Sequence, residues 1–479
     1  MQYNEEYFNS EDFRELLDSY EETVRLGEQP FMDDSDLVDI ADYYNFIGAY
    51  DKAVEAIDYA LSIYPHATLP NVFKAREALM QNDFEKAQQY ADTIESREDP
   101  DFHYLVAEIM VAEGRIEEAD RYLRDYAMTV TADEYQDFIK DCANLYIDYG
   151  INDKAYEWMM RSKDDDSTDF KELMARTLFG LGKYKDSERI FNELIDRNPF
   201  STSYWNALAS AQLMNEDYSN AITSSEYAIA IDPNDPEGVA SKANGLFRMG
   251  NYEDALEYFR RLEKLVPEDN FVLLHQGVCL VNLGRQEEAV EPLERALEQT
   301  LSNDSDDIDF LPQLYQELAF CYSHLKQPSK ALEMLDMTES LPCDHVDMLV
   351  IRGHIQLEHD MIMEAEQSFK KALQLSNNAP SVLLRIIVSL YDNRYVTACY
   401  EMFKKFYRAV NEFDPTFNKG YAYLALCCYD LGKIDEFQLY LRKAVENNPQ
   451  ETRLVLGCLF PQDMEVEGYC EYMKEKLNN

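Results

Sequence analysis

A spacing of 34 residues recurs through the middle of this chain. Three prolines and three alanines keep this step, namely Pro199, Pro233 and Pro267, and Ala221, Ala255 and Ala289. Repetition at such a period is typical of one small unit copied along a chain. Within each copy, apolar residues recur at i, i+3, i+4 and i+7, which is the period of one helix face. Because a single helix pair cannot bury both of its faces, the copies are expected to stack into a continuous core.

Two successive copies carry the residues that characterise the unit. The first has Trp205, Leu208, Tyr218, Ala221, Ala228 and Pro233, and the second has Ala243, Leu246, Gly250, Tyr252, Ala255, Phe259 and Pro267. This pattern resembles the helix–turn–helix unit of the tetratricopeptide repeat (TPR) family. The resemblance implies an all-α fold, a right-handed α-solenoid of about twelve helix–turn–helix repeats with helical caps.

A small residue marks the place where the two helices of each copy cross most closely. It can be followed along the chain as Ala53, Ala87, Ala119, Ala155, Ser187, Ala221, Ala255, Ala289, Ala331, Ala365 and Ala398, with Phe437 in the last copy. Glycines, for which a left-handed backbone costs little, mark many of the turns between the helices: Gly48, Gly114, Gly150, Gly182, Gly250, Gly284 and Gly432. These markers predict a TPR superhelix over residues 34–449.

Both ends of the array are predicted to be helical caps. Residues 1–33 contain an N-terminal capping helix, 11–26, with Ser10 as its N-cap. Its apolar face comprises Phe13, Leu16, Leu17, Tyr20 and Val24. Residues 450–479 are predicted to form C-terminal capping helices. An acidic insertion near 302–311 separates repeats eight and nine. We interpret it as a linker, because it lacks the sixth-place glycine and the closing glutamate of a calcium-binding loop.

The charge of the chain constrains its partners. The formal net charge is −48, so the chain repels nucleic-acid phosphates, whose affinity for proteins comes mainly from Lys and Arg. Anionic membrane surfaces are disfavoured for the same reason. Two interpretations remain open: the charge keeps the protein soluble and screens wrong contacts, or it attracts a basic partner. Binding of the second kind weakens as salt shortens the Debye length.

The cysteines and the N-terminus indicate a cytoplasmic location. The chain has nine cysteines without the spacings of a disulfide framework, which favours reduced thiols. Cys279, Cys321 and Cys427 occupy equivalent places in their repeats and are predicted to be small core residues. The first six residues lack the basic start and apolar core of a secretory signal. No apolar run reaches the length of a membrane span.

No catalytic, cofactor or metal site is predicted. The densest group of metal-binding residue types is Cys343, His345, His354 and His359. The last two histidines lie about 140° apart on one helix, so they cannot readily share a metal ion. Phosphate-loop, dinucleotide-binding and nucleophile-elbow motifs are missing from the sequence. Carboxylate pairs are so frequent that no single pair indicates acid–base chemistry.

The resemblance also implies where a partner would bind. In the TPR family the first helix of each pair lines a concave groove that usually receives peptides. The polar residues that correspond to this surface are Lys140, Asn144, Arg176, Asn206, Ser210 and Asn244, and the apolar ones are Leu274, Val278, Phe320 and Leu426. The first two resemble half of the carboxylate clamp by which some members hold an acidic chaperone tail, whereas Arg176, Asn206 and Ser210 depart from it.

Two uses of these residues are open. The polar residues can bond the backbone and a carboxylate of a bound peptide, and the apolar ones can hold an amphipathic helix or an extended segment. Alternatively, all of them pack along a closed superhelix. The resulting prediction is a non-catalytic cytoplasmic scaffold or adaptor that binds a partner protein or peptide in the concave groove. The alternatives are a chaperone-linked adaptor that recognises a peptide tail, or a TPR regulator of an enzyme. The identity of the partner and the oligomeric state stay open.

Overall fold

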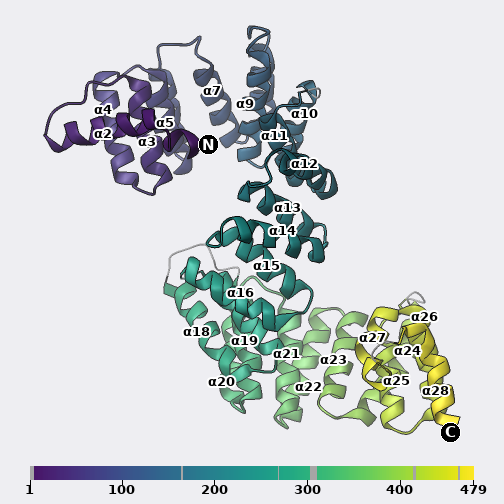
Figure 1. The fold of residues 1–479 in the computed structure, drawn as a ribbon. Helices are drawn as coiled ribbons and strands as arrows, with labels where there is room; N and C mark the ends of the chain where they lie inside the picture. Colours follow the sequence, from purple (N-terminus) through teal and green to yellow (C-terminus); the bar gives the residue numbers. More distant parts are fainter. Residues whose placement is uncertain are drawn as a thin grey trace. The chain divides into compact units, whose positions relative to one another are not determined.

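The computed structural model describes residues 5–162, 165–267, 269–302, 310–413, 417–461 and 464–478. Helices joined by short turns make up this part of the chain, which contains no β-strand. The predicted all-α repeat fold is confirmed (Figure 1). The chain divides into two compact units, Met1–Pro233 and Asn234–Asn479.

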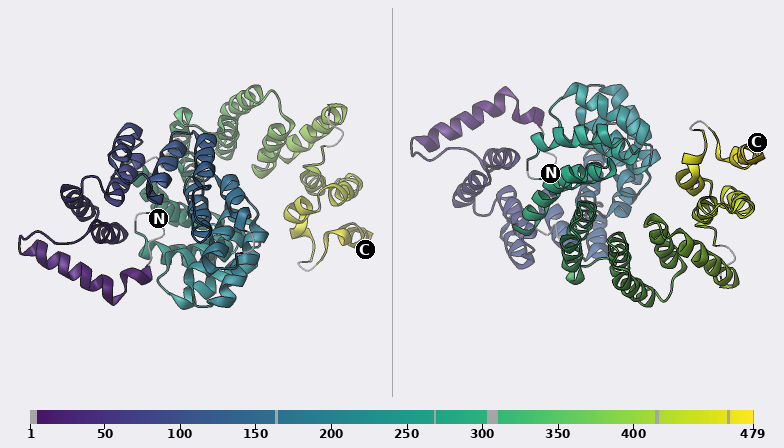
Figure 2. Two further views of the ribbon diagram at one scale, coloured as in Figure 1. Left: turned by 90° about the horizontal axis from the view of Figure 1, so that it is seen from above. Right: turned by 90° about the horizontal axis from the view of Figure 1, so that it is seen from below.

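The first unit contains six helix pairs. They are α3(Asp34–Phe46) with α4(Tyr50–Ile63), α5(Thr68–Met80) with α6(Phe84–Thr93), α7(Pro100–Ala112) with α8(Ile116–Tyr126), α9(Tyr135–Asp148) with α10(Asn152–Met159), α11(Thr168–Gly180) with α12(Tyr184–Arg197), and α13(Thr202–Met214) with α14(Tyr218–Ile231). The two helices of every pair pack against each other. Figure 2 gives two further views of the helical ribbon.

The second unit also contains six pairs. They are α15(Pro236–Arg248) with α16(Tyr252–Leu265), α17(Asn270–Asn282) with α18(Gln286–Ser302), α19(Leu311–His324) with α20(Pro328–Asp336), α21(His345–Glu358) with α22(Ile362–Leu375), α23(Pro380–Asp392) with α24(Val396–Phe413), and α25(Tyr421–Asp430) with α26(Ile434–Asn447). Twelve pairs are thus found among the described residues, as predicted. The insertion near 302–311 is described only at its edges, since residues 303–309 lie outside the described residues.

The residues predicted at the helix crossings are fully buried in eleven of the twelve pairs. The exception is the eleventh, where Ala398 is exposed and its neighbour Cys399 is fully buried. The prediction of Ala398 was therefore wrong by one residue. Cys399 lies 34 residues after Ala365 and keeps the repeat step. One residue turns a helix by about 100°, which moves the side chain from the crossing to the outside. Cys279, Cys321 and Cys427 are fully buried, as expected.

Each pair turns through one residue with a left-handed backbone. The seven predicted glycines all have positive φ, for example +75° at Gly48. The other five turns use residues that carry a side chain: Asn82, Glu216, Lys326, Asp360 and Arg394. A Cβ in this conformation is crowded by the following carbonyl oxygen, so these turns store strain that glycine would relieve.

Replacing Arg394 with glycine is expected to stabilise the second unit by about 0.5–1 kcal/mol. The φ of Arg394 is +69°, and its side chain makes no hydrogen bond or ion pair with the part of the chain that the structure describes. Urea unfolding followed by far-ultraviolet circular dichroism measures the change. Arg408→Gly is the control, because this exposed residue lies inside α24 and glycine there costs about 1 kcal/mol. An unchanged or lower midpoint for Arg394→Gly would contradict the strain.

The ends of the array are helical. In α2(Glu11–Arg25), the Ser10 side chain accepts a hydrogen bond from the Phe13 amide at 3.2 Å. Phe13 and Tyr20 are buried, whereas Val24 is exposed and lies outside the buried face on which it was predicted. At the other end, α27(Pro449–Leu456) and α28(Tyr469–Asn478) bury an apolar face made by Leu456, Tyr469 and Met473. None of the helices described is both long and apolar enough to cross a membrane.

Candidate functional site

A polar surface of the first unit is built by the first helices of repeats four, five and six. The helices α9 and α11 pack side by side. Asn144 lies eleven residues before the crossing residue Ala155, and Arg176 lies eleven residues before Ser187. Ser210 on α13 has the same relation to Ala221. The same interval places these three side chains at equivalent positions of successive inner helices. We call Asn144, Arg176 and Ser210 the polar row.

The side chains of the polar row have hydrogen-bonding capacity to spare. All three are half-buried, and none makes a side-chain hydrogen bond or ion pair with the residues that the structure describes. Arg176 is the notable member, because a guanidinium carries five donors in a planar fork that fits a carboxylate in two-point geometry. A half-buried arginine without an acid in a chain of net charge −48 has room for an external acceptor.

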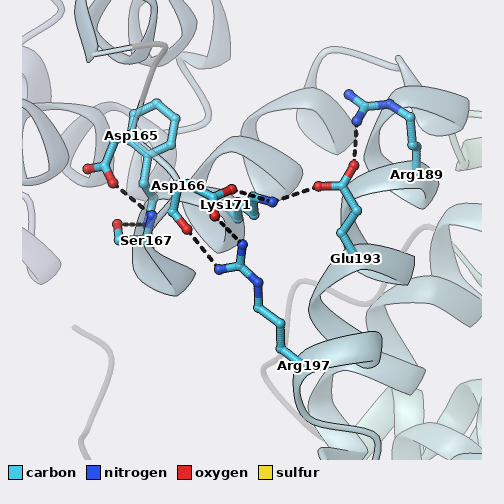
Figure 3. Close-up of polar contacts among 8 residues, drawn as sticks. Asp165, Asp166, Ser167, Lys171, Arg189, Glu193 and Arg197 are labelled. Atoms are coloured by element: carbon cyan, nitrogen blue, oxygen red, sulfur yellow. Dashed lines mark hydrogen bonds and ion pairs between the residues drawn. The ribbon is translucent and has the colours of Figure 1, made fainter.

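Other cations near α11 are already bound within the protein, as Figure 3 shows. Lys171 Nζ lies 2.7 Å from Asp166 Oδ1 and 2.7 Å from Glu193 Oε2. Arg197 bonds the same Asp166 carboxylate at 2.6 Å, and Arg189 bonds Glu193 at 2.7 Å. These contacts, that of Lys171 first, hold the pKa of both carboxylates below the ordinary value. Arg176 of the polar row differs from these three cations, because its side chain has no ion-pair partner among the described residues.

Lys140 and Asn206 were predicted beside the polar row, and both are less available than expected. Lys140 lies one turn before Asn144 on α9, and its Nζ is 2.7 Å from Asp137 Oδ1, a hydrogen bond that raises the pKa of the ammonium. Asn206 on α13 is buried, with 4% of its surface exposed. Tyr204 connects α13 to α11, because its hydroxyl donates to Glu172 at 3.3 Å. The predicted polar residues of this unit thus lie on α9, α11 and α13, and Asn206 is buried there.

Three residues that the sequence analysis missed also lie eleven residues before the crossing residue of their repeat. Asp42, Arg76 and Glu108 hold this position on α3, α5 and α7. Arg76 Nε donates to Glu108 Oε2 at 2.8 Å. Burial, and then the charge of Asp39, raises the pKa of Asp42 to about 6, while Arg76 opposes this shift. Arg76 and Glu108 therefore satisfy each other, whereas the buried Oδ1 of Asp42 has no hydrogen-bond partner among the described residues.

In the second unit, the residues that lie eleven positions before the crossing residue, counted from Cys399 in the eleventh repeat, are Asn244, Val278, Phe320, His354, Val388 and Leu426. Asn244 is half-buried on α15, and its side chain has no hydrogen-bond partner among the described residues. Leu274 and Val278 were predicted to offer an apolar contact surface, but they are 0% and 8% exposed. Their helix, α17, is packed by α16, α18 and α19, so these side chains belong to the core. Phe320 is half-buried.

Leu426 and the histidines have protein contacts of their own. Leu426 is half-buried and packs against the C-terminal core cluster. His354 Nδ1 lies 3.5 Å from Asn393 Nδ2, and His359 Nε2 lies 3.0 Å from Ser323 Oγ. Over the described ranges, no group of three or more His, Cys, Asp or Glu residues is arranged to hold a metal ion.

Comparison with known protein families matches the same kind of repeat in three stretches of the chain. One model described as "Tetratricopeptide repeat" matches residues 173–236 and 241–305, and a second model with the same description matches residues 418–451. A TPR repeat-containing protein of Methanocaldococcus jannaschii, MJ1428, is 22% identical over 77% of this chain and 68% of its own length. The TPR repeat-containing protein YpiA of Bacillus subtilis is 20% identical over 74% of this chain and 90% of its own length.

Solved structures include similar helical repeats. The crystal structure of YrrB, described as a TPR protein with an unusual peptide-binding site, is 16% identical, with a TM-score of 0.35 over 40% of this chain and 95% of that one. A tetratricopeptide repeat protein from Parabacteroides merdae is 14% identical, with a TM-score of 0.41 over 54% of this chain and 100% of that one.

Proposed function

Because this chain is a tetratricopeptide-repeat protein, we propose that it is a non-catalytic scaffold that binds a segment of a partner protein on its inner helices. Proteins built from these repeats bind protein or peptide partners. The observation that carries the proposal is the polar row, in which Asn144, Arg176 and Ser210 lie at equivalent positions with side-chain donors and acceptors unused within the described chain.

Each residue of the polar row has a role toward a bound segment. Arg176 binds a carboxylate of the segment through two parallel N–H···O bonds. Asn144 both donates and accepts, so its amide bonds the segment's backbone irrespective of the side chains. Lys140 is held by Asp137, so this pair adds no net charge beside the contact. Specificity per repeat is low, and affinity is the sum over several repeats.

The net charge and the cysteines of the scaffold indicate the kind of partner and the cellular compartment that suit it. The net charge of −48 favours partner segments that carry basic residues around the carboxylate. All nine cysteines are free thiols, which fits a reducing compartment, so we place the protein in the cytoplasm.

Replacing Arg176 with alanine is expected to weaken partner binding about tenfold or more, since a charge-assisted pair at a half-buried site is lost. The probe is a library of short random peptides, from which the wild-type protein selects binders. The affinities of the selected peptides are then measured by fluorescence anisotropy for both proteins. Arg121→Ala is the matched control, because this arginine is exposed on α8. Selection of no peptide by the wild-type protein, or equal binding by Arg176→Ala, would overturn the proposal.

A further inference from the structure

Glu317 on α19 occupies a position at which polar residues of several other repeats contact the element before them. This position lies fourteen residues before the crossing residue, here Ala331. In the first repeat its member Asp39 accepts a hydrogen bond from Tyr7 at 2.6 Å. In the eleventh repeat Arg385 forms an ion pair with Asp347 of the tenth. In the twelfth repeat Tyr423 lies edge-on to Tyr391 of the eleventh, with ring centroids 6.4 Å apart.

Glu317 differs from these three residues. Its carboxylate makes no hydrogen bond or ion pair with any residue in the described ranges. The preceding inner helix, α17, offers Leu274 and Val278, which are apolar and buried. The histidine of α17, His275, is engaged elsewhere: its Nδ1 lies 2.9 Å from the Phe271 carbonyl oxygen, and its ring packs among aromatic side chains.

The cationic side chains of the other helices packed around α19 also contact partners within the protein. Arg295 on α18 bonds Glu263 at 2.8 Å. Arg352 on α21 pairs with Asp336, and Lys330 on α20 lies over the Tyr322 ring at 5.0 Å. Glu317 is therefore a half-buried acceptor for which the described part of the fold provides no donor.

An unpaired, half-buried carboxylate lowers the stability of the folded protein. Burial alone raises the pKa of Glu317 to about 7, because a charged carboxylate is poorly solvated away from water. Phe320 lies three residues further along the same helix, on the same face, and is half-buried. Glu317 is thus a half-buried residue with an aromatic ring one turn away.

We propose that Glu317 anchors one lysine or arginine side chain of a partner segment that binds the second unit. This inference rests on the proposed function, since it names the chemistry by which a partner engages the second unit. The cationic head pairs with the Glu317 carboxylate, and the alkyl stem lies along Phe320, as long basic side chains do on apolar surfaces. A single carboxylate does not provide the ligand set that a metal ion requires, and the negative charge of the chain repels anionic ligands.

The test compares two random peptide libraries that differ at one fixed position. One library carries lysine there, and the other carries norleucine, which keeps the alkyl stem and removes the charge. The wild-type protein is expected to bind selected lysine peptides about tenfold or more tightly than their norleucine versions, and Glu317→Gln is expected to bind the two equally. Carbodiimide coupling, which joins an amine to a carboxylate in contact with it, is expected to cross-link the lysine to Glu317, as mapped by mass spectrometry.

Glu298→Gln is the matched control, because this exposed glutamate of α18 removes the same charge near the same repeat. It is expected to behave as the wild-type protein does. A lysine preference that persists in Glu317→Gln, or one that is absent from the wild-type protein while peptides still bind, overturns the anchor and leaves the scaffold proposal intact. Binding of neither library by the wild-type protein overturns both.

Discussion

Replacing Asp120 with alanine is expected to destabilise the first unit by about 3 kcal/mol. Asp120 lies on α8, and its side chain is 6% exposed. Its Oδ1 accepts a hydrogen bond from Trp158 Nε1 on α10 at 3.1 Å, and its Oδ2 lies 2.8 Å from Arg124 and 3.5 Å from Lys154 Nζ. Removing the carboxylate leaves a fully buried indole N–H without its acceptor. It also removes the most buried acid beside Arg124 and Lys154, which keep only the more exposed Glu157 and Glu117 as partners among the described residues.

Tryptophan fluorescence measures this effect in the first unit, because both tryptophans, Trp158 and Trp205, belong to it. The expected result is a lower urea midpoint with little change in slope. Asp125→Ala is the control, since this aspartate is exposed on the same helix, and its effect is expected to stay within about 0.5 kcal/mol. If the two variants unfolded at the same urea concentration, the Asp120 network would contribute nothing to stability.

Replacing Glu317 with glutamine is expected to stabilise the second unit by about 2–3 kcal/mol above pH 7, and hardly at all near pH 4. Burial raises the pKa of this carboxyl from its ordinary value of 4.5 to about 7 in the folded protein. The folded state therefore binds the proton more tightly than the unfolded state. The associated stability is fully present below about pH 4.5 and is lost as the pH rises through about 7. Glutamine is neutral throughout, so the variant escapes this loss.

Urea unfolding followed by far-ultraviolet circular dichroism, at acid and at mildly alkaline pH, checks this prediction. The difference between Glu317→Gln and the wild-type protein is expected to grow as the pH rises. Glu298→Gln removes an exposed carboxylate, and its effect is expected to be small. A stabilisation equal at both pH values would show that the ionisation of Glu317 is not its cause. A destabilised variant at alkaline pH would show that the carboxylate already has a partner in the free protein.

The repeat step carried most of the fold prediction. Helix periodicity, the crossing alanines and the turn glycines each depend on residues close together in sequence, so twelve helix pairs could be predicted without tertiary information. The failures are local. Ala398 was predicted at the crossing of the eleventh pair, but its neighbour Cys399 keeps the 34-residue step and is the side chain that α24 buries. Val24 has the spacing of the apolar face of the capping helix, but its side chain is exposed.

The candidate site was predicted less well, because equivalent positions do not have equivalent surroundings. The spacing predicted Asn144 and Arg176 at matching positions of their helices, and those helices, α9 and α11, pack against each other. It also placed Leu274 and Val278 on the same surface, where packing by three helices buries them instead. Glu317 received no attention, although it lies three residues before a predicted contact, because an acidic residue is unremarkable in so acidic a chain.

The sequence by itself determined the unit, its number of copies and the position of each side chain within its helix. These properties depend on periods of a few residues and on one repeated step. Only the tertiary structure decided which polar groups are satisfied. Arg76 finds Glu108 and Lys140 finds Asp137, whereas Arg176 and Glu317 find no partner among the described residues. Hydrogen bonds and ion pairs require approach to within about 3–4 Å, and such distances between repeats are set by packing that no single repeat encodes.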